Sequence, residues 1–174
     1  CEIIEAVHCL KGTGPNDVTQ LSIDLCADIL VQSGISKNKS EAKTSLLKNI
    51  KNGKAFKKFE KLIKAQNGDL NDISSKGITA KNQLIITSKE DGYVKSMNTE
   101  KIGWALVEMG CGRKTISDPL DHSAGIKFNY KIGDKVNKGD PFYEIFGYNE
   151  IKLENAKSIL LNTFNLSEQK IEKK

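Results

Sequence analysis

The sequence predicts an α+β protein: a layer of helices at the N-terminus, then a small mixed α/β domain. Within the first 70 residues, apolar positions recur three and four apart, which is the period of an amphipathic helix. From residue 83 onward, short runs rich in Ile, Val, Tyr and Phe alternate with glycine-containing turns, as strands do. Hydrophobic residues make up 38% and charged residues 28% of 174, a composition typical of a globular protein that buries a core.

Four amphipathic helices are expected in the first part. The second one begins after the turn that holds Pro15 and Asp17, residues suited to a first helical turn. Asn38 and Glu41 have the spacing of a capping box and predict the start of the third. Breaks in the apolar pattern end the four helices, in order, at Lys11–Gly12, Ser33–Gly34, Gly53 and Asn67–Gly68.

The stretch from Asp91 to Phe128 predicts a strand, a helix, a glycine turn, a loop and a second strand. Asn98 is a suitable N-cap, and the apolar residues after it follow the helical period. Gly110 stands where a helix needs a left-handed terminator, since a Cβ there would clash with the backbone.

These patterns divide the chain into a helical segment at 1–70, a polar linker at 71–82, an α+β domain at 83–166 and a frayed tail at 167–174. Within the α+β domain we expect strands at 84–87, 92–97 and 142–146 in one small mixed sheet. The two helices near 99–109 and 150–164 pack on it.

Charge and composition exclude several classes of protein. The net charge is +5, but Arg113 is the single arginine and the lysines are scattered among acidic residues, so no nucleic acid is expected as a partner. No apolar run is long enough to span a membrane, and no signal peptide is visible. Because the first residue is Cys1, we expect a cut or processed N-terminus. The four cysteines have no metal-ligand spacing and predict reduced thiols, mostly filling the core, in a cytoplasmic protein.

Several motifs occur together, in one order. They are E-A-x-x-x-L-x-G-x-G-P-x-D from Glu5, D-G-Y-V-x-x-M from Asp91, I-G-x-A-x-x-x-M-G-x-G-R from Ile102, D-x-x-D from Asp118 and G-D-x-V-x-x-G-D from Gly133. This set resembles the C-terminal portion of the thymidine and pyrimidine-nucleoside phosphorylases. The strand-turn motifs from Asp91 and Gly133 are also hammerhead-like, as in biotinyl and lipoyl domains.

The resemblance implies a transferase that converts a pyrimidine (deoxy)nucleoside and phosphate into free base and (deoxy)ribose 1-phosphate, in nucleoside salvage. It also implies a homodimer. The family holds phosphate with a K-H-S-T-G-G motif, and the base with an arginine and an S-x-x-x-K pair, and none of these occurs in this chain. Because preorganised donors supply most of the rate enhancement, we expect no catalytic residue here and no activity from the isolated chain.

The resemblance further implies a potassium ion in the full-length enzyme, with Glu5 as its carboxylate ligand beside main-chain carbonyls. For this chain alone we expect Glu5 to act instead as an acid that favours the helix dipole, and we expect no cofactor. The Gly12–Pro15 turn lacks the spacing of a phosphate-binding loop.

The remaining candidate residues have structural interpretations that we favour. Arg113 and Asp121 are expected to form a loop-fixing ion pair or carbonyl clamp rather than a substrate contact. The thiol of Cys111 is expected to be packed, and His8 and His122 to be structural or exposed.

Two other functions remain as alternatives: a carrier similar to biotinyl and lipoyl domains, or a non-catalytic interaction module. A carrier presents a lysine on a hairpin, whereas the corresponding position here holds Tyr148-Asn149 and Lys95 lies in the other half of the motif. The resemblance does not fix thymidine or uridine preference.

Overall fold

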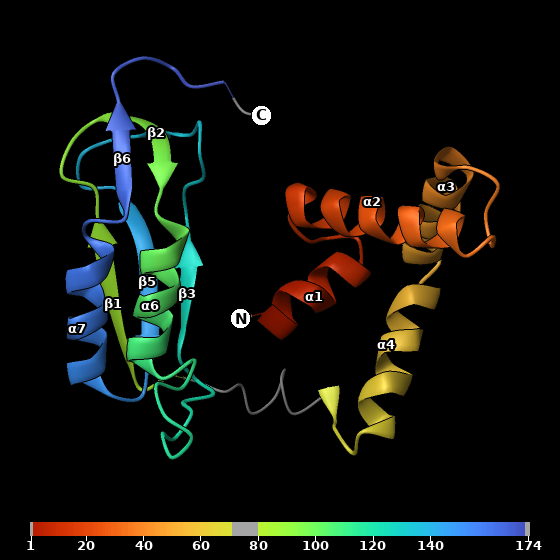
Figure 1. Cartoon of the computed structure of the whole chain (residues 1–174), viewed down its shortest axis with the longest axis horizontal. Helices are drawn as coiled ribbons and strands as arrows, with labels where there is room; N and C mark the ends of the chain where they lie inside the picture. The colour runs from red at the N-terminus through yellow and green to blue at the C-terminus, as the bar shows by residue number, and fades with distance from the viewer. Residues whose placement is uncertain (1, 71–79, 173–174) are drawn as a thin grey trace. The chain divides into compact units, whose positions relative to one another are not determined.

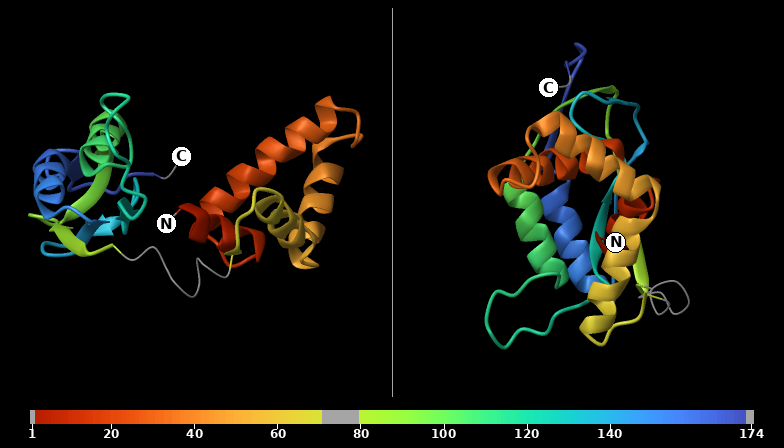
Figure 2. Two further views of the ribbon diagram at one scale, coloured as in Figure 1. Left: turned by 90° about the horizontal axis from the view of Figure 1, so that it is seen from below. Right: turned by 90° about the vertical axis from the view of Figure 1, so that its right-hand side faces the viewer.

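The computed structural model describes residues 2–70 and 80–172 and divides into two compact units, Cys1–Gly77 and Ile78–Lys174 (Figure 1 and Figure 2). We call them the helical unit and the sheet unit. The described part of the first contains helices, and the second combines strands with helices. The predicted α+β class is therefore confirmed.

The helical unit contains α1 (Glu2–Leu10), α2 (Asn16–Gln32), α3 (Lys39–Lys51) and α4 (Lys54–Ala65). These helices begin and end where the sequence predicts. At the start of α3, the side chain of Asn38 accepts a hydrogen bond from the backbone N–H of Glu41, at 2.9 Å. Gly53, between α3 and α4, has a φ of 74°, which a side chain would disfavour.

The core of the helical unit is very small. Its buried hydrophobic residues, among those that the structure describes, are Ile23, Ala27 and Ala42. Many larger apolar side chains of the same unit remain exposed: Ile3, Ile4, Leu21, Leu25, Ile29, Ile35, Leu47 and Leu62. The four helices thus leave much of their apolar surface open to solvent.

The sheet unit consists of two antiparallel three-stranded sheets and two helices. One sheet has the strand order β1-β5-β3 and the other β4-β2-β6. Helices α6 and α7 lie side by side, and α7 packs on β1 and β5 (Figure 1). The elements are, in order, β1 (Asn82–Thr87), β2 (Gly92–Met97), α6 (Thr99–Met109), β3 (Gly125–Phe128), β4 (Lys135–Val136), β5 (Pro141–Gly147), α7 (Glu150–Leu160) and β6 (Phe164–Ser167).

The core of the sheet unit is much larger than that of the helical unit. Thirteen buried residues drawn from both helices and from five of the strands form one hydrophobic cluster. Phe142 and Tyr143 of β5 lie at its centre, fully buried. Phe142 stacks on Phe164 of β6, with ring centroids 3.7 Å apart, so the aromatic rings join the two sheets.

Three details of the prediction are wrong. The strands at 84–87, 92–97 and 142–146 are present, but they belong to two antiparallel sheets and not to one mixed sheet. The last helix ends at Leu160, and Phe164 begins a strand, because its ring packs on Phe142 and this tertiary contact outweighs the helical period. Ser167 therefore ends a paired strand, opposite Tyr93, and does not begin a frayed tail.

The predicted linker at 71–82 lies largely outside the described residues. Its last residue, Asn82, already belongs to β1.

Candidate functional site

The turn after α1 is a helix terminus. The backbone N–H groups of Gly12 and Thr13 donate to the carbonyls of Cys9 and His8, at 3.0 and 2.9 Å. His8 also meets the hydroxyl of Thr13, with Nδ1 3.2 Å from Oγ1. A Cβ on Gly14 would lie 2.4 Å from the Cys9 Sγ, so the chain there packs directly on α1. Because two of the turn's amides already bond the helix, its geometry suits a helix end better than a phosphate cradle. His8 has the expected structural contact.

Glu5 lies in the first turn of α1 and is exposed. In the described parts of the chain, no group of three or more His, Cys, Asp or Glu side chains could hold a metal ion. Glu5 can therefore supply one carboxylate oxygen to a cation but forms no complete site with its described neighbours. Its position also suits the alternative role, since a carboxylate in a first turn favours the helix dipole.

All four helices of the helical unit line one open groove, of about 720 Å³, and Glu5 lies on its wall. The carboxylates of Glu2 and Glu5 come from α1, and the ammonium groups of Lys54 and Lys58 come from α4. Most of the remaining lining is apolar, including Leu10, Val18, Ile23, Leu46, Ile50 and Phe59.

The glycine-rich loop after α6 is organised by Asp121. Gly110 ends α6 with a φ of 98°, and its carbonyl accepts a hydrogen bond from the Asp121 backbone N–H, at 2.9 Å. The Asp121 carboxylate accepts from the N–H and the hydroxyl of Ser123, at 2.9 and 2.6 Å. Its other oxygen accepts from the backbone N–H of Tyr148, at 2.7 Å, and so ties this loop to the turn before α7.

Two glycines make room for this carboxylate. A Cβ on Gly110 would lie 3.2 Å from the Asp121 Cβ, and a Cβ on Gly147 would lie 3.3 Å from Asp121 Oδ2. Burial of Asp121 raises its pKa, but the hydrogen bonds from Ser123 and from the backbone N–H groups of Tyr148, Ser123 and Ala124 outweigh burial and leave the pKa below its usual value. The ionised carboxylate of Asp121 thus stabilises the loop through these hydrogen bonds.

Arg113 takes no part in this arrangement. It is exposed, and the predicted ion pair with Asp121 is wrong, because Ser123 and Tyr148 occupy that carboxylate. The neighbouring Lys114 instead pairs with Glu108 of α6. The hydrogen bonds from Lys114, and then from Asn155 of α7, lower the pKa of Glu108.

The thiols differ from the prediction. Cys111 is exposed, so the predicted packed thiol is wrong. Cys26 is also exposed and Cys9 is half-buried, so the described cysteines do not fill the core. The glycines on each side of Cys111 explain this, since such a turn lies on the surface. His122 is exposed, as expected.

The position of a carrier lysine is occupied by a helix start. Asn149 is the N-cap of α7, and its side chain accepts from the backbone N–H of Lys152, at 3.1 Å. Lys81 lies over the ring of Tyr148, 5.3 Å from its centroid. A cap fixed in this way presents no attachment group, so the architecture does not favour the carrier alternative.

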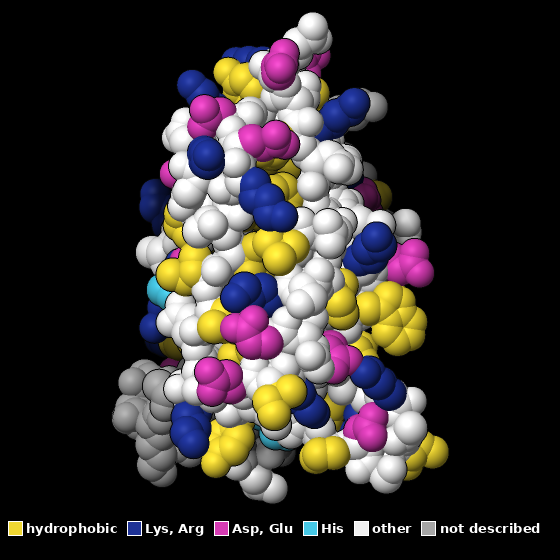
Figure 3. Space-filling model, turned by 90° about the vertical axis from the view of Figure 1, so that its left-hand side faces the viewer, with side chains coloured by type: hydrophobic (Ala, Val, Ile, Leu, Met, Phe, Trp, Pro, Cys, Tyr) yellow, Lys and Arg dark blue, Asp and Glu magenta, His cyan; other side chains and the backbone are white. Residues whose placement is uncertain are grey.

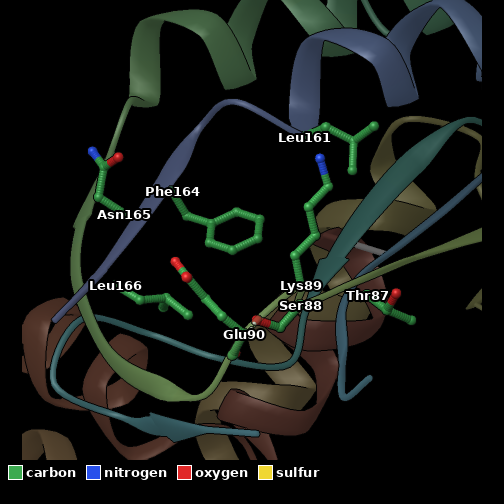
Figure 4. A pocket seen from close by; sticks show the side chains of 8 residues that line it. All are labelled: Thr87, Ser88, Lys89, Glu90, Leu161, Phe164, Asn165 and Leu166. Atoms are coloured by element: carbon green, nitrogen blue, oxygen red, sulfur yellow. Dashed lines mark hydrogen bonds between the residues drawn. The ribbon is translucent and has the colours of Figure 1, made fainter. Parts of the chain in front are cut away.

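A small polar pocket of about 200 Å³ lies between the β1–β2 turn and the start of β6, with Lys89 and Glu90 beside Phe164 (Figure 4). It gathers one ammonium and one carboxylate but no nucleophile with a base. On the face shown in Figure 3, basic, acidic and hydrophobic side chains are interspersed and form no single-sign patch.

The sequence did not reveal which acids fasten the turns. Asp91 accepts a hydrogen bond from the backbone N–H of Lys138, at 2.7 Å and 47 residues away. Asp140 accepts from the N–H of Asn137 and from the hydroxyl of Tyr130, both at 2.9 Å. The repeated pairing of glycine with aspartate was the available signal, because aspartate commonly caps turns. These acids, like Asp121, hold loops.

Comparisons with known proteins match one domain in the sheet unit and longer stretches of the chain. Residues 93–167, within the sheet unit, match the Pyrimidine nucleoside phosphorylase C-terminal domain. A pyrimidine-nucleoside phosphorylase of Bacillus subtilis is 36% identical over 151 residues, which cover 86% of this chain and 35% of the relative. One of Staphylococcus epidermidis is 37% identical over 141 residues, covering 80% and 33%. One of Staphylococcus aureus is 36% identical over 146 residues, covering 83% and 34%.

Residues 93–167 thus form a domain of the pyrimidine nucleoside phosphorylase C-terminal class. A match of 151 residues is longer than the sheet unit, so the similarity extends into the helical unit. The chain belongs to the pyrimidine-nucleoside phosphorylase family and corresponds to a C-terminal portion of its members. It spans about one third of the length of the curated relatives that it matches.

Among the described residues, every helix is too short or too polar to cross a membrane.

Proposed function

We propose that this chain serves as the C-terminal part of a pyrimidine or thymidine phosphorylase, acting in nucleoside salvage. The complete enzyme would transfer the pentosyl group of a pyrimidine (deoxy)nucleoside to phosphate, which releases the free base and (deoxy)ribose 1-phosphate. The observation that carries this proposal is the similarity to pyrimidine-nucleoside phosphorylases over 80–86% of the chain.

Within such an enzyme, this chain would supply support rather than chemistry. Phosphorolysis needs a cationic, amide-rich pocket for phosphate and donors for the departing base. The hydrogen bonds of Asp121, Asp91 and Asp140 all fix loops of the sheet unit, and Glu108 joins α6 to α7. These four acids therefore have structural partners. We propose that the phosphate and nucleoside sites lie in the part of the enzyme that this chain does not match.

The test is an assay of thymidine and uridine phosphorolysis with two proteins. The first is the purified chain, which we expect to show no turnover. The second is a fusion in which this chain replaces the matching third of the Bacillus subtilis relative, and which we expect to cleave at least one nucleoside. Turnover by the chain alone would place catalytic groups within it. A folded fusion without turnover would contradict the proposed function.

Glu5 is proposed as a potassium ligand of the complete enzyme. A single carboxylate among neutral carbonyls suits a singly charged, hard cation. Glu5 fits this role because it is an exposed carboxylate at the edge of an open groove. In the fusion, Glu5→Gln is expected to weaken the potassium dependence of both activity and melting temperature. The matched change Glu2→Gln, on the same groove and helix, is expected to leave both unchanged. An unaltered potassium response in Glu5→Gln would remove Glu5 from the site.

We further propose that the complete enzyme is a cytoplasmic homodimer. The free state of Cys9 and Cys26 supports a reducing compartment. Sedimentation of the fusion tests the dimer, and a monomer at micromolar concentration would contradict it.

A further inference from the structure

Two asparagine–glycine pairs stand at helix ends in the helical unit. Asn52-Gly53 separates α3 from α4, and Asn67-Gly68 follows α4. Asparagine is a thermolabile residue, and a following glycine makes it more so, because no Cβ shields the backbone nitrogen that attacks the side-chain amide. Both asparagines are exposed. Each pair is therefore a candidate for spontaneous chemical modification.

Asn67 closes α4 with a backbone geometry that glycine usually supplies. Its φ is 60°, and among the described residues no other non-glycine residue has a positive φ. Its N–H donates to the carbonyl of Lys64 at 3.0 Å, and the N–H of Gly68 donates to the carbonyl of Ile63 at 2.9 Å. These are the two bonds of the Schellman motif, with Asn67 in the left-handed position. Because that position is less favourable for asparagine than for glycine, this cap opens more readily than one closed by glycine.

The two asparagines differ in what holds their side chains. Asn52 Oδ1 accepts a hydrogen bond from the backbone N–H of Lys54, at 3.0 Å. The Asn67 side chain makes no hydrogen bond within the part of the chain that the structure describes. The glycine nitrogens are equally engaged, since the N–H of Gly53 also donates to a carbonyl, that of Ile50, at 3.0 Å. Reaction at Asn52 must therefore break one more hydrogen bond than reaction at Asn67.

We propose that Asn67-Gly68 is a site of spontaneous deamidation and isoaspartate formation, and that the hydrogen bond to Asn52 Oδ1 protects the other pair. The backbone nitrogen of Gly68 loses its proton and bonds to Asn67 Cγ, the Cγ–Nδ2 bond breaks, and the nitrogen leaves as ammonia. Water then opens the cyclic imide. Its addition at Cγ gives aspartate, and its addition at the main-chain carbonyl carbon gives isoaspartate. This inference does not rest on the proposed function.

The modification acts on the end of α4, because the attacking nitrogen of Gly68 is also the donor that closes the helix. Isoaspartate routes the main chain through Cβ and Cγ, which adds one carbon atom between the two N–H groups of the cap. The bond from Gly68 to Ile63 then loses its register. The fit there is tight, since a Cβ on Gly68 would lie 2.9 Å from Ile63 Cγ2. The new carboxylate also stands at a helix C-terminus, where negative charge is unfavourable. We expect the last turn of α4 to fray.

The experiment ages the purified chain in mildly alkaline buffer, once folded and once in urea. Peptide mass spectrometry measures the conversion of amide to acid at each asparagine, and an isoaspartyl methyltransferase identifies isoaspartate. Dividing the folded rate by the urea rate at each site removes the effect of local sequence. We expect this ratio to be about two- to tenfold higher at Asn67 than at Asn52, the factor that one hydrogen bond supplies. A ratio at Asn52 equal to or above that at Asn67, or no conversion at Asn67 in the folded chain, would overturn the proposal.

Two variants test the effect on the helix end. Asn67→Gly keeps the left-handed cap and removes the reacting side chain, so ageing should leave the amide hydrogen exchange of α4 unchanged. Asn52→Ser is the matched control: it removes the other pair, and ageing should still speed exchange at the end of α4, as in the wild type. Unchanged exchange in the aged wild type, or equal changes in Asn67→Gly and the wild type, would refute the inferred effect on the cap.

Discussion

Asp121 is predicted to be the residue whose loss most weakens the glycine-rich loop. Asp121→Ala removes the acceptor of three hydrogen bonds, from the N–H and hydroxyl of Ser123 and from the N–H of Tyr148. The last of these links positions 27 residues apart. The change therefore releases the loop from the turn before α7.

The expected loss follows from the bonds removed. A hydrogen bond to a charged group contributes about 1.5–3 kcal/mol, and water replaces part of each bond at a half-buried site. We expect Asp121→Ala to lower the free energy of unfolding of the sheet unit by about 3 kcal/mol. For a domain of this size, that corresponds to a fall in melting temperature of roughly 12–24 °C.

Asp118 provides the matched control. Its carboxylate accepts from the N–H groups of Lys114 and Thr115 and from the hydroxyl of Thr115, at 2.7–2.9 Å, but all of these lie within four residues. Asp118→Ala should cost less than about 1 kcal/mol, because it loosens one exposed turn only. Urea denaturation followed by the fluorescence of Trp104, the single tryptophan, reports on the sheet unit directly. Equal losses from the two substitutions, or a loss below about 1 kcal/mol from Asp121→Ala, would refute this account of the loop.

The pH dependence gives a second measure of Asp121. Because its pKa is lowered in the folded state, the ionised form stabilises the fold above the unfolded pKa of about 3.9. That contribution is lost as the pH falls below about 4 and through the folded pKa. Asp121→Asn cannot ionise, so the difference in stability between wild type and variant should shrink as the pH falls from about 5 to 2. A difference that stays constant over this range would contradict the assigned ionisation.

Three further substitutions are predicted, each measured by the same denaturation. Tyr143→Phe should cost about 1–2 kcal/mol, because the buried hydroxyl lies 3.0 Å from Thr163 Oγ1 and its loss leaves that oxygen with one partner fewer. Gly110→Ala should cost about 1–3 kcal/mol, owing to its φ of 98° and the approach of Asp121, whereas Gly103→Ala, in an open helical position, should gain about 0.5–1 kcal/mol. Asn98→Ala should lower the free energy of unfolding by about 1 kcal/mol, since the Asn98 side chain accepts a hydrogen bond from the N–H of Lys101 at 3.0 Å. An unchanged stability would contradict the stabilising role of this N-cap.

Local signals in the sequence predicted the helices well. Asn38 and Asn98 cap the helices that their spacing indicates, and Gly110 ends α6 in the left-handed conformation expected of it. These features depend on residues within one helical turn, so a single stretch of sequence contains the whole cause. Phe164 shows where that reasoning stops. Phe164 continues the apolar spacing of the preceding helix, but it lies in a strand because its ring stacks on Phe142, 22 positions earlier, in the other sheet.

The interpretation of the glycine-rich loop failed for a similar reason. Opposite charge suggested that Arg113 would pair with Asp121. The carboxylate instead accepts a hydrogen bond from the backbone N–H of Tyr148. Because almost every residue carries a backbone N–H, the sequence alone cannot indicate which one is the donor. The tight approach of Gly147 to Asp121 was equally hidden, because it depends on how β5 meets the loop. Family motifs located the right residues here, while their partners required the fold.

The unequal cores of the two units have a consequence for how such proteins evolve. The sheet unit closes its own cluster around Phe142 and Tyr143, and so it can be joined to an unrelated chain by gene fusion and keep its fold. The helical unit has no comparable freedom, because Ile23 and its two buried alanine neighbours cannot hold four helices together. Recombination should therefore preserve the helical unit only together with a surface that completes it. The sheet unit is portable, whereas the helices are inherited with their partner.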